Sequence, residues 1–508
     1  MSTPPPRAER APASRPPSTP AAHRRAGRLG VAALVALPAV LLAACAAGPD
    51  YVRPGVELPA AYKEVAGWKS AEPQVAGSTQ AWWERYGDPT LDGLMRDADR
   101  ANQNLRVAEA QYRQARALAD AARAGFYPNV GAAAGVQRAR TNTSGVKTAS
   151  TVDLGLSASW EPDLWGSVRR SVEAGQAGAQ ASADDLAAAR LSIQAALAQD
   201  YFQLRITDQQ RELYATTTAA YARALQLTQA QYRAGVVLRS DVALAESQLA
   251  TAQAQAVDLD VQRSQLEHAI AILVGRAPAS FSLAPAADAP SLATRLPASP
   301  ESLPSALLER RPDIAAAERR VAQANADIGV ARAAYFPALT LSASGGYAAD
   351  ALAGLFDTPS RVWSLGAALA QTLFDGGLRR AHDAQAVAAY DAAVAQYKQT
   401  VLTGLQAVED NLAALATLDR ESGLQAQAVQ ASQLAERLAL SQYRAGTTNY
   451  LSVITAQTLA LTNQRTAVQL RGRQLAASVG LITATGGGWT TADAAPASNP
   501  TTNPEPTP

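Results

Sequence analysis

Side chains that could carry out catalysis or bind a metal are scarce in this sequence. Its 508 residues include three histidines, His23, His268 and His382, and a single cysteine, Cys45. None of them has the CxxC or HExxH spacing of a zinc site, and no GxSxG string marks a serine nucleophile. We therefore expect neither an enzyme nor a bound metal or other cofactor, and the remaining chemistry to explain is that of the cysteine.

The cysteine ends an apolar segment near the start of the chain. Three arginines between positions 24 and 28 precede an apolar run from Leu29 to Ala44, which closes on small residues. This order resembles the signal peptide of a bacterial lipoprotein, whose cysteine is acylated and becomes the first mature residue. The alternative is a membrane-spanning anchor, because the run nearly reaches spanning length. Pro38 interrupts the run, which favours the signal peptide.

We therefore expect residues 1–44 to be a signal peptide and Cys45 to be the lipidation site. Acyl chains such as palmitate contribute about 0.8 kcal/mol per buried methylene, so two or more anchor a protein stably. Ala46 and Ala47 replace the aspartate that retains many bacterial lipoproteins in the inner membrane. The resemblance thus implies the outer membrane as the location.

The charge balance excludes one class of partner. Lys and Arg number 45 and Asp and Glu 44, which gives a formal net charge of +1. No whole-molecule attraction for nucleic acid follows from this, and we expect no nucleic-acid partner.

The rest of the chain consists of two copies of one unit. The string QYRAG occurs at Gln231–Gly235 and at Gln442–Gly446, an offset of 442 − 231 = 211 residues. ARAGFYP at 122–128 and ARAAYFP at 331–337 match at an offset of 331 − 122 = 209. Repeats this long exclude a solenoid and indicate an internal duplication. We predict repeats at 82–290 and 291–485, a periplasmic segment at 45–81 and a disordered tail at 486–508.

Each repeat is predicted to contain a helix, a β-hairpin, a long helix and a return helix. The chain has 29 prolines, but none lies between Gly166 and Gly235 or between Gly377 and Gly446. Two uninterrupted helices, 166–235 and 377–446, are therefore expected, each on the order of 100 Å long at 1.5 Å per residue. Helices of this length imply a coiled coil or a helical barrel. A plain coiled-coil stalk is the alternative.

Two predicted β-hairpins, at 126–162 and 337–374, have alternating apolar and small or polar residues. Each strand is close to the nine to eleven residues that cross a bilayer in a tilted barrel strand. The apolar positions are Val130, Ala132, Ala134, Val136, Val152, Leu154, Leu156, Ala158, Trp160, Leu339, Leu341, Trp363, Leu365, Ala367 and Leu369. Aromatic residues on the helical side of the hairpins are expected to form a girdle at the membrane boundary. They are Phe126, Tyr127, Trp165, Tyr335, Phe336 and Phe374.

Four strands cannot close a barrel, and open sheet edges are not tolerated in lipid. Two chains would give eight strands, whose interior side chains fill, whereas three give twelve strands and an open lumen. The predicted fold class is therefore a mixed membrane protein, mainly α and internally duplicated. If transport is the purpose, a homotrimer is the minimal assembly, and it would form a 12-stranded barrel in outer-membrane lipid, continued by a long periplasmic α-helical barrel.

Several strings together resemble the TolC-like outer-membrane efflux proteins, in particular the OprM-like or NodT-type lipoprotein branch. They are GPDY at 48–51, RP at 53–54, WW at 82–83, LLERRPDI at 307–314, IGVARAAYFP at 328–337 and the two QYRAG strings. The resemblance implies a trimeric, passive exit duct for small toxic compounds. Its partners would be a periplasmic adaptor (membrane fusion) protein and an inner-membrane pump, usually of the resistance-nodulation-division class.

The resemblance also implies a gate at the far periplasmic tip of the long helices. Tyr443 matches the family's gating tyrosine and Asp241 its aspartate partner, so a hydrogen bond between them would hold the tip shut. The turns at Gly235 and Gly446 would dock the adaptor, in a helix-in-groove mode.

Other positions at the tip depart from the family pattern. Ser452 and Thr455 occupy the positions of a paired acidic ring, and Thr448 occupies that of a basic latch. We therefore expect no strong block by cations. Arg233, Arg239 and Arg444 make the tip basic, although they could equally be solvated charges at helix ends.

Two other functions fit parts of the pattern. A type I protein-secretion duct would share the architecture, but the lipidation signal favours small-molecule efflux. A trimeric adhesin would place its barrel at the C-terminus, whereas the hairpins here lie inside both repeats.

Overall fold

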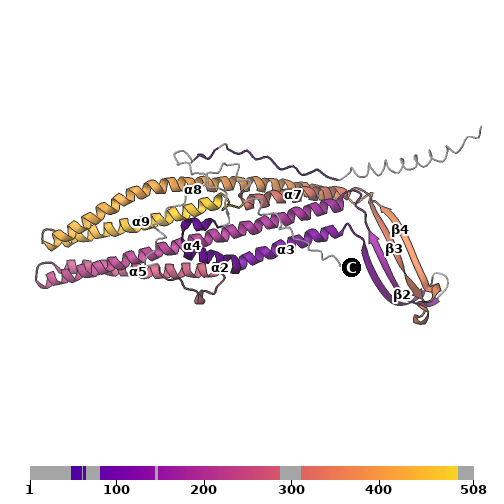
Figure 1. Cartoon of the computed structure of the whole chain (residues 1–508), viewed down its shortest axis with the longest axis horizontal. Coiled ribbons are helices and arrows are strands. Elements are labelled where there is room, and N and C mark those ends of the chain that lie inside the picture. Colours follow the sequence, from indigo (N-terminus) through magenta and orange to yellow (C-terminus); the bar gives the residue numbers. More distant parts are fainter. Residues whose placement is uncertain (1–46, 60, 64–80, 143–146, 286–309, 490–508) are drawn as a thin grey trace, which may run out of the picture. The chain divides into compact units, whose positions relative to one another are not determined.

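The computed structural model describes residues 47–59, 61–63, 81–142, 147–285 and 310–489 (Figure 1). Cys45, the predicted signal peptide and the predicted C-terminal tail lie outside these residues. The described chain divides into two compact units. Unit 1 holds Ala47 and residues 129–167 and 336–371, and unit 2 holds the rest.

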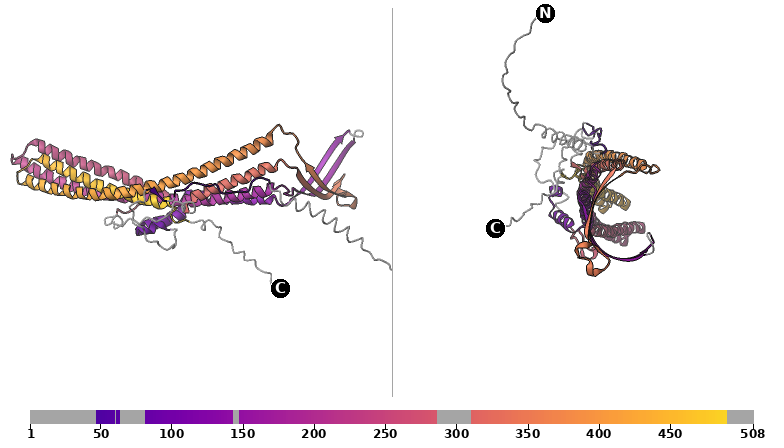
Figure 2. Two further views of the ribbon diagram at one scale, coloured as in Figure 1. Left: turned by 90° about the horizontal axis from the view of Figure 1, so that it is seen from above. Right: turned by 90° about the vertical axis from the view of Figure 1, so that its right-hand side faces the viewer.

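Unit 1 is a four-stranded antiparallel sheet, which confirms the predicted number of strands. Its strands are β1 (Asn129–Thr141), β2 (Lys147–Trp160), β3 (Ala338–Ala349) and β4 (Arg361–Ala370), in the order β1-β2-β3-β4. Two short 3-10 helices, η6 (Leu352–Gly354) and η7 (Thr358–Ser360), lie between β3 and β4. The sheet is curved, as the end-on view in Figure 2 shows.

The strand register places the predicted apolar positions on one face of this sheet. Leu154 pairs with Ala134 of β1 and with Tyr347 of β3, and Leu341 pairs with Ala367 of β4. Most of the large side chains of this face are open to solvent in the single chain, with Leu365 75% exposed, whereas Leu339 and Leu341 are half-buried. The opposite face is small and polar, and the Ser344 and Ser364 hydroxyls are 2.8 Å apart on it. One face is therefore suited to lipid and the other to water.

Unit 2 is helical and carries two very long helices. In the first repeat its elements are η2 (Trp82–Tyr86), α2 (Pro89–Ala101), α3 (Gln103–Ala124), α4 (Ser167–Arg233), α5 (Arg239–Leu273) and η3 (Pro278–Ser280). In the second repeat they are α7 (Pro312–Ala333), α8 (Leu378–Arg444) and α9 (Tyr450–Ala484). Helices α4 and α8 have 67 residues each, which corresponds to about 100 Å of length at 1.5 Å per residue. No helix among the described residues is long and apolar enough to cross a membrane.

Two apolar clusters hold the helices of unit 2 together. In the first, Tyr86 of η2 packs with Phe202 of α4 and Val479 of α9, and in the second Ile314 of α7 packs with Val401 of α8. Small residues allow close approach elsewhere, since a Cβ on Gly175 of α4 would lie 3.0 Å from the Ala119 Cα of α3. This explains the alanine-rich composition, because small side chains bring helix axes close together.

Candidate gate at the tip of the helical hairpins

Helices α4 and α5 form one hairpin and α8 and α9 form another, and each turns at a QYRAG string. Gly235 (φ 71°) and Gly446 (φ 72°) adopt the left-handed conformation. The N–H of Gly235 donates to the Tyr232 carbonyl and that of Val236 to the Gln231 carbonyl, both at 2.9 Å. The second turn has the same two bonds one repeat later, so each turn is a Schellman motif that satisfies carbonyls at the helix end.

The two hairpins pack against each other near these turns. Ala245 of α5, Tyr443 of α8, and Tyr450 and Val453 of α9 form a buried apolar cluster, and Leu225 of α4 packs on it. The Tyr443 and Tyr450 rings are 5.2 Å apart between their centroids, at a tilt of 54°. We call these residues, together with Thr228, the tip cluster.

Thr228 and Tyr443 connect the two hairpins by a hydrogen bond. The Tyr443 hydroxyl donates to Thr228 Oγ1 across 3.3 Å, and Thr228 in turn donates to the Ala224 carbonyl at 3.0 Å. Both side chains are buried. Burial raises the pKa of Tyr443, and the negative charge of Asp241 adds to the rise. Tyr443 therefore remains a neutral donor at physiological pH.

The predicted partner of Tyr443 has a different hydrogen bond in the single chain. Asp241 lies in the first turn of α5, and its carboxylate accepts the Leu238 N–H at 3.4 Å, which is the acidic half of a capping box, since the Leu238 side chain has no acceptor. Among the described residues no hydrogen bond joins Tyr443 to Asp241. The tyrosine bonds to Thr228 instead because Thr228 is buried between the two hairpins, whereas the Asp241 carboxylate points back to its own helix start.

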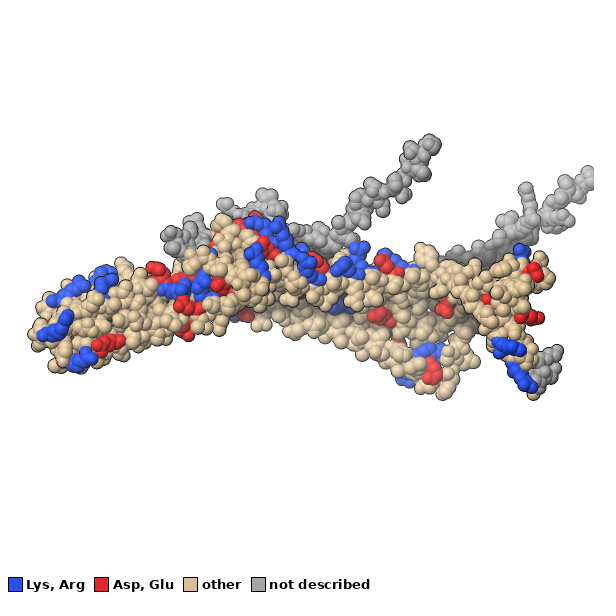
Figure 3. Space-filling model, turned by 90° about the horizontal axis from the view of Figure 1, so that it is seen from below, with Lys and Arg blue, Asp and Glu red and all other residues tan. Residues whose placement is uncertain are grey.

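The basic and polar residues predicted at the tip are mostly exposed. Arg233 and Arg444 end α4 and α8, and Arg239 pairs with Glu246 at 3.4 Å. Figure 3 shows basic side chains around this end of unit 2. Ser452 donates to Asn449, the N-cap of α9, and Thr455 to the Leu451 carbonyl; both are exposed, and Thr448 is half-buried. The side chains at the two positions of the family's acidic ring, Ser452 and Thr455, are thus hydrogen-bonded to α9 and its N-cap.

Sequence analysis missed Thr228 and Tyr450. Thr228 lies seven residues before Gly235, on the same face of α4 as Tyr221 and Ala224, and a spacing of seven places all three on one buried stripe. Tyr450 is the first residue of α9 and is 1% exposed. Its aromatic type just after a helix cap was the only signal available.

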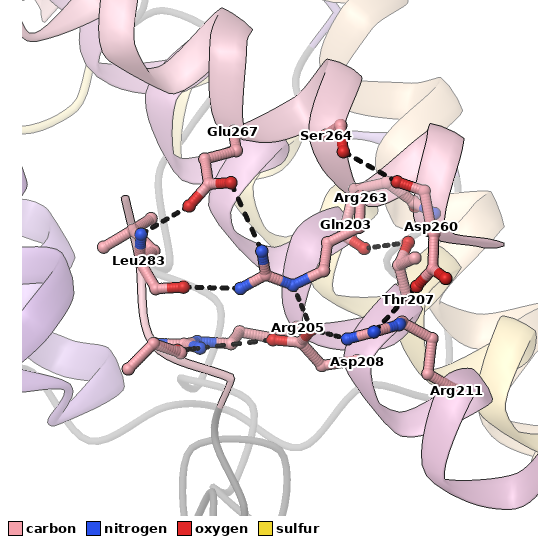
Figure 4. A network of polar contacts seen from close by, with 11 residues as sticks. Gln203, Arg205, Thr207, Asp208, Arg211, Asp260, Arg263, Ser264, Glu267 and Leu283 are labelled. Atoms are coloured by element: carbon pink, nitrogen blue, oxygen red, sulfur yellow. Dashed lines mark hydrogen bonds and ion pairs between the residues drawn. The ribbon is translucent and has the colours of Figure 1, made fainter. Parts of the chain in front are cut away.

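A buried ion network lies farther along the first hairpin (Figure 4). The Asp208 carboxylate of α4 accepts from Arg263 Nε of α5 at 2.8 Å and pairs with Arg205 at 3.3 Å. Arg263 also pairs with Glu267 at 3.3 Å, and both bind the backbone of Leu283. The network therefore fastens the segment after η3 onto the α4–α5 hairpin.

Four of the strings that carry the family resemblance join helices or segments in unit 2. A Cβ on Gly48 would lie 2.5 Å from the Gly329 Cα, so these glycines allow the N-terminal segment to cross α7. The Trp82 indole donates to Gln194 at 3.3 Å, and Arg311 donates to the carbonyl of Ala484, the last residue of α9, at 2.9 Å. These residues position elements and carry no chemistry of their own.

The predicted membrane-boundary aromatics are divided between the two units. In unit 1, Trp165 stacks on Phe336 with centroids 4.8 Å apart, and its indole donates to the Pro337 carbonyl. In unit 2, Arg379 lies 5.5 Å over the Tyr335 ring. Phe126, Tyr127 and Phe374 are exposed in unit 2, Phe374 by 88%.

Comparison with known proteins gives a consistent result. The model of the outer membrane efflux protein family matches residues 94–276 and 303–487. The pyoverdine export outer membrane protein OpmQ of Pseudomonas aeruginosa is 33% identical over 460 residues, covering 89% of this chain and 95% of OpmQ. The toluene efflux pump outer membrane protein TtgF of Pseudomonas putida is 31% identical over 464 residues, covering 89% of this chain and 95% of TtgF.

Solved structures agree. The outer-membrane channel OprN superposes with a TM-score of 0.80 at 31% identity, over 88% of this chain and all of OprN. The open state of the MtrE outer membrane channel of Neisseria gonorrhoeae superposes with a TM-score of 0.77 at 29% identity, over 88% of this chain and 99% of MtrE. Such channels are trimers with a β-barrel and a periplasmic helical barrel, coupled to an adaptor and an inner-membrane pump. This chain thus belongs to the outer membrane efflux protein family and is the outer-membrane channel of a tripartite efflux pump.

Proposed function

We propose that this channel passively exports small toxic compounds supplied by a pump of the resistance-nodulation-division class through a periplasmic adaptor. The relative TtgF, which has a similar length, is named a toluene efflux pump outer membrane protein. Toluene is a small, apolar, toxic compound, which is the class of cargo proposed here. The chain acts as a duct and performs no catalysis. A deletion strain should become more susceptible to a panel of dyes, solvents and antibiotics, and plasmid-borne wild type should restore resistance. Unchanged susceptibility across the panel would exclude this cargo class.

The gate of this duct is proposed to be the tip cluster. The observation that carries the proposal is the Tyr443–Thr228 hydrogen bond, which joins the two hairpins beside their turns. Opening requires the hairpins to separate there, so the bond and the packing of Tyr450 oppose opening. Conductance of purified trimers in planar bilayers tests this directly, because a weakened contact raises the open fraction. The basic residues Arg233, Arg239 and Arg444 and the uncharged Thr448, Ser452 and Thr455 would make the aperture insensitive to cation block.

The turns at Gly235 and Gly446 are proposed to dock the adaptor. Beside the first turn, Val236 and Leu238 are 68% and 72% exposed, and Leu451 follows the second turn with its side chain also exposed. Exposed apolar side chains at helix ends fit the groove of a helical hairpin. Cysteines placed at Val236 and at Thr447 should crosslink to the adaptor's hairpin tip in cells. A cysteine at the exposed Gln406, near the middle of α8, is the control and should not crosslink.

Membrane attachment is proposed to occur in two ways. Cys45 would be acylated after removal of residues 1–44, and the aromatics Phe126, Tyr127, Trp165, Tyr335, Phe336 and Phe374 would border the lipid. Mass spectrometry of the purified protein should show acyl chains that Cys45→Ser abolishes. The fluorescence that Phe374→Trp adds to that of the wild type should be quenched by lipids that carry a spin label near the headgroup, and the fluorescence that Leu424→Trp adds should not be.

A further inference from the structure

Four polar side chains, one from each helix of the two hairpins, meet between the tip cluster and the middle of the helices. They are Tyr221 of α4, Gln248 of α5, Glu436 of α8 and Gln457 of α9. Gln248 Nε2 donates to Gln457 Oε1 at 3.3 Å, which bridges the two hairpins. The Gln457 amide lies beside the Glu436 carboxylate, and the Gln248 amide beside the Tyr221 hydroxyl. We call these four residues the inter-hairpin network.

The inter-hairpin network lies in an apolar environment. Gln457 is 3% and Tyr221 4% exposed, and Tyr221 packs with Tyr214, Ala252 and Leu259. Within the described residues the Gln248 Oε1 atom has no hydrogen-bond partner. An unmade hydrogen bond on a buried polar atom costs about 1–3 kcal/mol. Apolar side chains at these positions would stabilise the packing of the two hairpins without this cost. The inter-hairpin network therefore stabilises the packed state less than an apolar contact would.

The duplication does not account for the network. At the offset of 211 residues set by QYRAG, Glu436 corresponds to Leu225 (436 − 211) and Gln457 to Glu246 (457 − 211). Leu225 packs on the tip cluster and Glu246 pairs with Arg239 near the first turn. The acid and its amide partner therefore belong to the second repeat alone, the same repeat that supplies Tyr443.

We propose that the inter-hairpin network is a second closure contact, which positions the α8–α9 hairpin for the tip gate and tightens when Glu436 takes up a proton. The proposal rests on the gate proposed at the tip cluster. Tyr221, Gln248, Glu436 and Gln457 are positioning residues, since they act through the hairpins that carry Tyr443.

The proton dependence follows from the surroundings of Glu436. Burial raises the pKa of this carboxyl, and Arg437 on the same helix and the Gln457 amide oppose the rise. Tyr221 faces it from α4 and Gln457 from α9. A raised carboxyl pKa means that the packed state binds the proton more readily than a state with Glu436 in water. Closure is therefore favoured in acid and weakens as the pH rises through the packed-state pKa.

The test is the conductance of full-length trimers in planar bilayers between pH 5 and pH 8. We expect the wild-type open-to-closed ratio to fall several-fold on acidification, the direction that follows from the raised pKa of Glu436. Glu436→Gln keeps the shape of the side chain and cannot ionise. Its open-to-closed ratio should therefore stay at the wild-type value for pH 5 over the whole pH range. Gln457→Leu leaves the carboxylate without its amide partner and should raise the ratio at pH 7.5. Glu212→Gln, at an exposed position on α4, should behave like wild type.

Each result supports or overturns the proposal. If Glu436→Gln retains the wild-type pH profile, the network is not a closure contact. Should Gln457→Leu fail to assemble, Glu436→Gln still decides, because it preserves hydrogen bonding to Gln457. The tip gate is judged separately by Tyr443→Phe. If that variant conducts more than wild type while the network variants keep the wild-type pH profile, the tip gate is supported and the inter-hairpin network is excluded as a closure contact.

Discussion

The hydroxyl of Tyr443 on α8 donates to the Thr228 hydroxyl on α4, and this bond joins the two helical hairpins beside their turns. Tyr443→Phe removes the donor, and Thr228→Val leaves the buried donor unpaired. Because an unsatisfied buried group costs about 1–3 kcal/mol, Thr228→Val should open the channel more than Tyr443→Phe does. Single-channel recording of each variant measures the increase.

Two further variants make this prediction specific. Tyr232→Phe removes a hydroxyl from a tyrosine that is 43% exposed in the last turn of α4, and it should conduct like wild type. Asp241→Ala removes the contact to the Leu238 N–H and the negative charge near Tyr443. A carboxylate in the first turn of a helix stabilises the helix start by about 0.3–1 kcal/mol. If Asp241→Ala opens the channel more than Thr228→Val, the carboxylate and not the threonine is the partner that matters.

The two turn glycines should respond alike to substitution. Nothing lies within 4 Å of a Cβ added to Gly235 or Gly446, so the cost of Gly→Ala is that of the left-handed backbone alone. We expect each variant to lose about 1–2 kcal/mol. Gly423→Ala, in the interior of α8 with equally open surroundings, should instead stabilise by about 0.5–1 kcal/mol. Thermal unfolding of the trimer in detergent measures the changes, and equal signs for Gly235 and Gly423 would contradict the backbone argument.

The fold was largely predictable from the sequence, because its signals are periodic and long. The proline-free stretches predicted α4 and α8, and the alternation around Leu154 and Leu365 predicted the apolar face of the sheet. The duplication made each signal appear twice. These are properties of whole segments, which single residues do not override.

The partners at the tip could not be predicted in this way. Tyr443 was identified by resemblance, but its acceptor is a threonine that the repeat pattern did not mark, and Asp241 caps its own helix instead. Gln248 and Gln457 come together only because the two hairpins pack with a particular stagger. Such contacts depend on a few ångströms of helix register, about which sequence spacing within one helix carries no information.

The ion network around Asp208 should be essential for the stability of the first hairpin. Arg263→Met removes the cation 2.8 Å from a carboxylate that is 5% exposed. Breaking one side of a buried ion pair costs about 3–5 kcal/mol, because the remaining charge is left in an apolar site. Arg211→Met is the matched control. Its side chain is 35% exposed and pairs mainly with the outer Asp260, so we expect a loss of about 1 kcal/mol or less.

Thermal unfolding of the trimer and limited proteolysis distinguish these variants. Arg263→Met should expose the segment around Leu283 to protease, since Arg263 holds its carbonyl. Equal stability of the two variants would show that the network contributes no more than an exposed ion pair.

Asp184 should make the trimer more stable in mild acid than at neutral pH. Burial raises the pKa of this α4 carboxyl to about 6, with Asp185 and Glu318 adding to the rise against Arg319. Its Oδ1 atom has no hydrogen-bond partner within the described part of the chain. The folded state therefore takes up a proton that the unfolded state releases, and this contribution is full below about pH 4 and lost as the pH passes 6.

Asp184→Asn should consequently raise the unfolding temperature at pH 7.5, and by a smaller amount at pH 5, where part of the wild-type contribution is still present. Asp185→Asn, next to it on α4, serves as the control, because Asp185 is half exposed and forms an ion pair with Arg320. Loss of that pair should lower the unfolding temperature slightly at both pH values. The carboxylate of Asp184 would have to be stabilised by a partner if Asp184→Asn destabilised the trimer at pH 7.5. A gain that is larger at pH 7.5 than at pH 5 would identify it as a buried charge that destabilises the α4–α7 packing at neutral pH.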